Sequence, residues 1–273
     1  ILAGTGKALI WSEDFWPNHP CCVIAVDRDW LAASPNNEEI LKGVLKAHIE
    51  ATNWIQDAMA DPDGENYSLL LDLGAQFSNR NTSVVKSSLE HMKLDYQLTD
   101  TSKEYLVNFT NEYIDQGLIA NGTIQTRGYD SVEDFVDTYV DTTYLEEAED
   151  FEEPSAMLGS VSMGYLTGDL HQFARVVASS DDVGGGESLF EKYGVTVTTP
   201  QAGGYANGGA VMDAFAANAI DIGYLGSPPT ILKHLNGNIN TVIVAQANSE
   251  GSAVIVNNDV TDFKDLGGNF VAT

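Results

Sequence analysis

The spacing of apolar and polar positions changes about halfway along the 273-residue chain. Before residue 150, apolar positions recur mostly at helical spacing. The clearest case is residues 34–60, where Ser34 is placed to cap a helix and Pro35 to begin its first turn. From residue 160 onward, short apolar runs alternate with helical stretches. Strands that alternate with helices predict βαβ units and a mainly parallel sheet.

The first half is predicted to contain one buried strand, residues 22–27, followed by helices. These helices are expected at 34–60, 82–92, 102–116 (ended by Gly117) and 131–149. In the second half, strands are expected at 160–166, 195–199, 220–225, 241–247, 251–257 and 269–273. The helices between them are expected at 169–178, 207–218 and 227–237, with short ones near 184–194 and 262–268.

Four loops follow predicted strands and therefore share one edge of the expected sheet: 166–172, 200–209, 225–230 and 247–253. In an open parallel sheet, ligands bind outside the carboxyl ends of the strands. Three of these loops are rich in glycine and small hydroxyl residues and lead into helix N-termini. Such termini expose N–H groups and the positive end of a dipole, so they can hold an anion without Lys or Arg.

The charge balance excludes several partners. The chain has 13 basic and 40 acidic residues, a net charge of −27. Such a chain repels phosphate backbones and anionic lipids, so neither nucleic acid nor a membrane surface is expected as a partner. No apolar run is long enough to predict a membrane span. The composition suits a protein that stays dispersed in salt or outside a cell.

Four Asn-x-Ser/Thr sequons cluster in the first half of the chain, at Asn66, Asn81, Asn108 and Asn121. Their clustering predicts N-glycosylation of one outer face and, with the acidity, an extracellular location.

The motifs of the second half resemble a known family. The segment "IDIGYLGSPPTILKHLNGNINTVIVAQANSEGSAVIVNNDVTDFKDLGGNFVAT" and, before it, "MGYLTGDLHQFARVVA" are similar to solute-binding proteins of ABC importers. The solutes of that family include nitrate, sulfonates, taurine and thiamine-precursor pyrimidines. The resemblance implies a type II periplasmic-binding-protein fold that delivers a small polar solute to an ABC permease. It implies neither a cofactor nor catalysis.

The order of the segments departs from the family's order. The segment "GTGKALIWSEDFWPNHPCCVIAV" is similar to the family's return from its second lobe, yet here it comes first. The resemblance therefore implies a single lobe, residues 1–273, assembled in permuted order. Residues 1–150 correspond to the family's C-terminal segment and 161–273 to its N-terminal segment, joined by a linker at 151–160. A second lobe is expected from a flanking segment or another chain.

The same resemblance places the solute among the four loops. The expected ligand-binding residues are Gly168, His171, Gly204, Tyr205, Gly226 and Ser227, with Asn248 and Glu250 at the edge and Asn18 and His19 at the rim.

The stretch "HPCC" invites a metal-site interpretation through His19, Cys21 and Cys22. Adjacent residues of a strand point to opposite faces, and no CxxC or HxxxH pair completes a site, so no metal is expected. Buried free thiols are favoured over a strained vicinal disulfide.

Two other functions compete with solute binding. One is a structural or adhesive surface module that keeps the lobe and has lost transport. The other is a thiamine-pyrimidine synthesis enzyme of the same fold, which would need a cofactor-binding lysine near the cleft. No lysine falls at the carboxyl end of a predicted strand.

Overall fold

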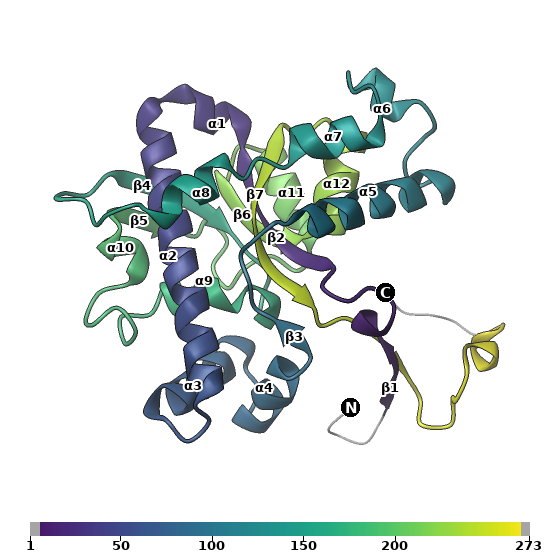
Figure 1. Ribbon diagram of the computed structural model, residues 1–273, viewed down its shortest axis with the longest axis horizontal. Helices are drawn as coiled ribbons and strands as arrows, with labels where there is room; N and C mark the ends of the chain where they lie inside the picture. The colour runs from purple at the N-terminus through teal and green to yellow at the C-terminus, as the bar shows by residue number, and fades with distance from the viewer. Residues whose placement is uncertain (1–5, 269–273) are drawn as a thin grey trace.

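The computed structural model describes residues 6–268. Helices cover both faces of a six-stranded sheet, and a separate two-stranded sheet projects from the body of the molecule (Figure 1). The α/β class expected from the sequence is confirmed. Within residues 6–268, no helix is both long enough and apolar enough to cross a membrane.

The main sheet draws on both halves of the chain. Its strand order is β3-β7-β2-β6-β4-β5. The strands are β2 (Pro20–Asp27), β3 (Met92–Lys93), β4 (Gly159–Gly164), β5 (Val195–Thr198), β6 (Ile222–Gly226) and β7 (Thr241–Glu250). Strand β2 comes from the first half and lies between β6 and β7.

The expectation of a mostly parallel sheet is only partly right, because the sheet is mixed. Strand β4 pairs in parallel with β5 and β6, but β2 runs antiparallel to β6 and β7, and β3 antiparallel to β7. The βαβ pattern of the second half accounts for the strands that run in one direction. Strand β2 has no such crossover to its neighbours, so no local signal sets its direction.

Twelve α-helices are found among the described residues: α1 (Arg28–Ala33), α2 (Pro35–Ala60), α3 (Glu65–Ser78), α4 (Thr82–Leu89), α5 (Asp100–Asp115), α6 (Thr123–Thr126), α7 (Val132–Tyr139), α8 (Thr143–Glu149), α9 (Phe173–Ala178), α10 (Leu189–Lys192), α11 (Gly208–Ala216) and α12 (Ser227–Gly237). The predicted cap of α2 is confirmed, since the Ser34 side chain accepts from the Asn36 N–H. The single helix predicted at 131–149 is wrong: it breaks at Val140, which bridges to Ile243 of β7. Helix α3 was not expected, and the strand predicted at 269–273 lies outside the described residues.

Strand β2 joins the two halves of the chain through its side chains. Cys22, Ile24 and Val26 pack on one face, in a core that includes residues of α2 and α9. Val23 and Ala25 pack on the other face, in clusters formed with α5, α7, α11 and α12. Burial on both faces explains why the strand reads as a continuous apolar run. Each fully buried aliphatic side chain contributes roughly 1.5–3 kcal/mol, so this strand is central to stability.

The two-stranded sheet pairs the beginning of the described chain with its end. Strand β1 (Lys7–Trp11) runs antiparallel to β8 (Ala253–Val256). It projects beside the N-terminal end of β2 (Figure 1). Its outer side chains are exposed, with Ile255 at 53%. The chain therefore crosses between this sheet and the main sheet twice, through the segment before β2 and at Gly251.

Candidate solute site

A cavity of about 920 Å³ opens at the edge where β4, β6 and β7 end and β2 begins. Its volume is within the roughly 300–1,000 Å³ range of small-molecule sites. The edge agrees with the rule that ligands bind outside the carboxyl ends of parallel strands. The lining residues come from five regions: Ser12, Trp16 and His19–Cys22; Leu166, Asp169 and His171; Asn207 and Gly208; Gly226–Pro229 with Ser252; and Asn108, Phe109, Asn111–Tyr113 and Gln116 of α5 and its end.

Two helices begin at this cavity. Asn207 caps α11, and its Oδ1 accepts from the Ala210 N–H at 3.0 Å. Helix α12 begins at Ser227, which is fully buried yet lines the cavity. Pro228 and Pro229 have no N–H, so α12 offers fewer free donors than an ordinary helix start. The positive dipole ends of both helices nevertheless favour negative charge here.

His171 supplies the cationic group of the cavity. Its Nδ1 lies 2.6 Å from Oδ1 of Asp169, and its Nε2 lies 3.3 Å from the carbonyl oxygen of Gly251. Both partners are acceptors, so both ring nitrogens must carry a proton to satisfy them. Burial alone would lower the pKa of His171, but the Asp169 hydrogen bond and nearby negative charge raise it to about 9. The imidazole is therefore a cation at neutral pH.

Both cysteines line the cavity, contrary to the alternation expected of a strand. The register of β2 against β7 shifts between Pro20 and Cys22 and again between Cys22 and Val23. The Asn248 side chain fills this irregularity, since its Oδ1 accepts from the Cys22 N–H at 2.9 Å. Such a bulge re-aims side chains, so both cysteine residues line the cavity.

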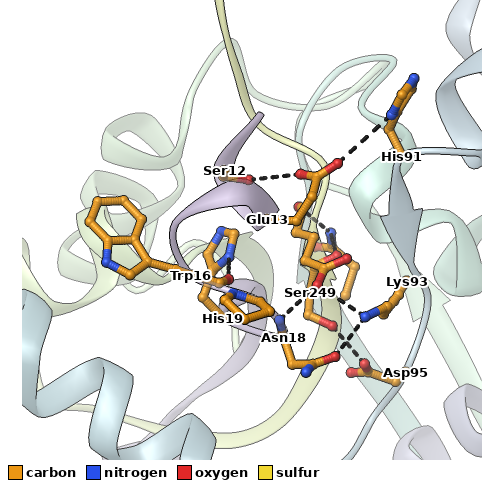
Figure 2. A network of polar contacts seen from close by, with 12 residues as sticks. Ser12, Glu13, Trp16, Asn18, His19, His91, Lys93, Asp95 and Ser249 are labelled. Carbon is orange, nitrogen blue, oxygen red and sulfur yellow. Dashed lines mark hydrogen bonds and ion pairs between the residues drawn. The ribbon is translucent and has the colours of Figure 1, made fainter. Parts of the chain in front are cut away.

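An aromatic cluster forms part of the wall beside the rim. The His19 ring makes edge contacts with Trp16 and Phe109, at centroid distances of 6.3 and 6.2 Å. Figure 2 shows the His19 ring beside the Trp16 backbone, where its Nδ1 lies 2.6 Å from the Trp16 carbonyl oxygen. The Trp16 side chain is 48% exposed. The wall can therefore cover the apolar part of a bound molecule.

Asn18 and Glu250, two predicted contacts, belong to a network behind this rim. Figure 2 labels Asn18, Lys93 and Ser249 of this network. The Glu250 carboxylate accepts from the Asn18 N–H at 2.7 Å and from Lys93 at 3.0 Å, and Lys93 also donates to the Asn18 side chain. Nearby, the Ser249 hydroxyl donates to Asp95 at 2.7 Å. These contacts tie the segment before β2 to the end of β7, and neither Asn18 nor Glu250 is among the cavity-lining residues.

The other predicted residues divide between the cavity and its surroundings. His19, His171, Gly226 and Ser227 line it. Gly168 instead lines a neighbouring pocket of about 330 Å³, which also includes His171. Tyr205 is held by backbone hydrogen bonds to Tyr165 and Thr167, and Asn248 is buried below the floor. At Gly204, a Cβ would lie 2.7 Å from the Tyr165 ring, so glycine serves packing there.

The part of the cavity wall formed by α5 was not expected from the sequence. Phe109, Glu112 and Tyr113 come from a helix more than fifty residues from any predicted loop of the site. Its spacing predicts a helix but not which neighbour the helix covers. The Asn108 sequon also lies on this wall. Among the residues that the structure describes, no group of three or more His, Cys, Asp or Glu could hold a metal ion.

Comparison with protein families matches the NMT1-like family over residues 1–64 and 161–269. The match covers more than half of the chain, and the chain belongs to this family. The resemblance expected from the loop motifs is confirmed. Membership implies a periplasmic-binding-protein type of fold and suggests solute binding. Residues 65–160, which include α5, lie outside the matched segments. Comparison with curated proteins and with solved structures finds no match.

Proposed function

We propose that this chain is an extracytoplasmic solute-binding component of an ABC importer and that its solute is a small anion or an anion-bearing zwitterion. Nitrate, a sulfonate, taurine and a thiamine-pyrimidine precursor are the candidates. Family membership supports the solute-binding class. The cavity at the strand ends supports the location of the solute.

The observation that carries the proposal is the charge of His171. Among the described residues that line the cavity there is no Lys or Arg, so this imidazolium is the main cation available to a solute. Its charge adds to the dipoles at the starts of α11 and α12. Asp169 is already paired with His171, whereas Glu112 lies on the α5 wall and suits the ammonium group of a zwitterion.

We also propose that the chain forms one lobe in permuted order and that a second lobe closes over the cavity. The mixed sheet, in which β2 of the first half lies between β6 and β7 of the second half, supports the single lobe. Phe15 and Trp16 at the rim are 57% and 48% exposed, which suits a surface covered on closure.

A pair of isosteric substitutions tests the anion site. Asn207→Asp adds a negative charge at the cavity and keeps the cap of α11, because Asp caps as well as Asn. Asn81→Asp adds the same charge at the cap of α4, outside the cavity, where Asn81 accepts from the Val84 N–H. Binding of nitrate, methanesulfonate and taurine is measured by calorimetry on unglycosylated protein.

We expect Asn207→Asp to weaken binding of the preferred anion by about tenfold or more, since a charge several ångströms away costs on the order of 1–2 kcal/mol. Asn81→Asp should bind like the unsubstituted chain. Equal affinities in the two variants, or no binding of any tested anion, would contradict the proposal.

A further inference from the structure

The cavity is lined by two cysteines that the proposed solute site does not use. Cys21 is partly exposed and Cys22 is buried, and both are free in the described structure. The Sγ of Cys21 lies 3.8 Å from the Ser252 hydroxyl, and the neighbouring Gly251 carbonyl contacts His171. The short turn after β7, at Gly251 and Ser252, therefore contacts both the Cys21 thiol and the His171 imidazolium.

The groups around Cys21 differ in what they do to its charge. Cys21 and Cys22 are adjacent and both line the cavity, and the neighbouring Cys22 thiol is the main reason that the pKa of Cys21 falls to about 6. Burial opposes the shift, the His171 cation assists it, and Asp169 opposes it weakly. The neighbouring Cys21 thiol and burial raise the pKa of Cys22. His19, Glu112 and Tyr113 are the other titratable groups that line this cavity.

These positions give the two cysteines different roles. The thiolate is the nucleophilic form of cysteine, and a neighbouring cation or thiol donor favours it. Cys21 is both the accessible thiol and the one whose surroundings stabilise the anion. Cys22 remains a protonated thiol next to it.

We propose that Cys21 is a nucleophilic thiol at the cavity floor that captures small disulfides, and that Cys22 and the His171–Asp169 pair hold it in its reactive form. In the reaction, the Cys21 thiolate attacks one sulfur of a disulfide, RS–SR. The Cys21 S–SR bond forms as the RS–SR bond breaks, and the released RS⁻ takes a proton from the His171 imidazolium or from water. The incoming disulfide is the oxidant, and the leaving thiol is the reduced product.

This capture goes beyond solute binding and competes with it, because above about pH 6 the Cys21 thiolate offsets the charge that His171 offers to an anion. A mixed disulfide on Cys21 would occupy the cavity that the proposed solute uses. The cavity, at about 920 Å³, is large enough for a small aromatic disulfide.

The test uses the full chain and 2,2′-dithiodipyridine, whose released thione is followed by absorbance from pH 4 to pH 10. We expect one fast equivalent per chain, with a rate midpoint near pH 6. Peptide mass spectrometry should place the adduct on Cys21. The Cys21→Ser variant should lose the fast phase. If that variant does not fold, the position of the adduct in the unsubstituted chain, found by mass spectrometry, shows which cysteine reacts.

Three variants separate the supporting groups. Cys22→Ala removes the thiol donor, whereas Cys22→Ser keeps a donor and should retain the low midpoint. His171→Gln removes the cation, and His91→Gln is its matched control, because His91 lies outside this cavity beside Glu13. We expect the midpoint to rise most in Cys22→Ala, less in His171→Gln and not in His91→Gln.

The pH profiles of the labelling rate should also cross between the unsubstituted chain and a variant in which the pKa of Cys21 is no longer lowered. A merely structural effect would not produce this crossing. If the pKa of Cys21 returned to the roughly 8.5 of a free thiol, the thiolate fraction at pH 6.5 would fall about 75-fold. A thiolate of higher pKa is intrinsically more nucleophilic, by about 13-fold for this difference, so the net rate should fall about sixfold at pH 6.5 and rise about twelvefold at pH 9.5. A midpoint near 8.5 in the unsubstituted chain, equal labelling of both cysteines, or no labelling would overturn the proposal.

Discussion

The charge states of His48 and His171 follow from the atoms that face their ring nitrogens. His48 has the Gln246 carbonyl 3.0 Å from Nε2 and the Tyr224 hydroxyl 3.4 Å from Nδ1. One acceptor and one possible donor satisfy a neutral ring, and burial lowers the pKa of His48 to about 4. His171 faces two acceptors and is charged. Residues of the same type thus serve as a neutral core group in one place and as a cation in another.

The neutral state of His48 predicts a loss of stability in acid. The pKa of His48 is about 4 in the folded chain and about 6.5 in the unfolded chain. The unfolded chain therefore binds the proton first, so the contribution of His48 to the free energy of unfolding is complete above pH 6.5 and is lost as pH falls toward 4. The full difference is on the order of 3 kcal/mol. We expect His48→Gln, which cannot titrate, to show a shallower fall in unfolding free energy between pH 6.5 and 4.5.

Urea unfolding at several pH values measures this effect, and His91→Gln, at a partly exposed histidine, is the control. Parallel pH profiles for the unsubstituted chain and His48→Gln would show that the buried ring does not resist protonation.

At the scale of elements, the junction of β7 and β8 positions the site. Glu250 and Gly251 both adopt left-handed backbone, with φ of 63° and 86°, and this turn leads the chain out of the main sheet. A Cβ on Gly251 would lie 2.7 Å from Nε2 of His171. Glycine is therefore required at position 251 for two reasons: the backbone has a positive φ, and the His171 ring leaves no space for a Cβ.

A matched pair of substitutions separates these two requirements. Gly251→Ala and Gly185→Ala both place alanine at positive φ, at 86° and 76°, but a Cβ on Gly185 meets nothing within 4 Å. Each should lose about 1–2 kcal/mol to backbone strain. We expect Gly251→Ala to lose more, and to weaken anion binding, because it displaces His171.

Denaturant unfolding and anion calorimetry on both variants provide the measurement. If Gly251→Ala behaves like Gly185→Ala in both assays, the turn does not position the imidazolium.

At the scale of the whole molecule, the net charge of −27 produces self-repulsion that salt should relieve. The Debye length falls from about 30 Å at 0.01 M salt to between 3 and 10 Å at 0.5 M, so distant repulsions are screened. We expect the melting temperature to rise by several degrees over this range at pH 7.5. Near pH 4.1, the calculated isoelectric point, the rise should be much smaller. Equal salt effects at the two pH values would assign the stabilisation to a cause other than charge.

The sequence by itself determined the features that local chemistry controls. Ser34 and Pro35 mark the start of α2 because a cap needs only neighbouring residues. The apolar run of β2 shows that this strand is buried on both faces, and the loop motifs indicate the edge of the sheet where the cavity lies. The family resemblance follows from the same local motifs.

Only the tertiary structure decided the features that depend on distant partners. The register shift at Cys22 arises where β2 meets Asn248, and both cysteines line the cavity. Helix α5 becomes a wall through packing that its own spacing does not encode. Asp169, two residues away, faces one nitrogen of His171, but the carbonyl that faces the other comes from Gly251, 80 residues later. Each depends on long-range contacts, whose geometry short-range patterns along a chain do not specify.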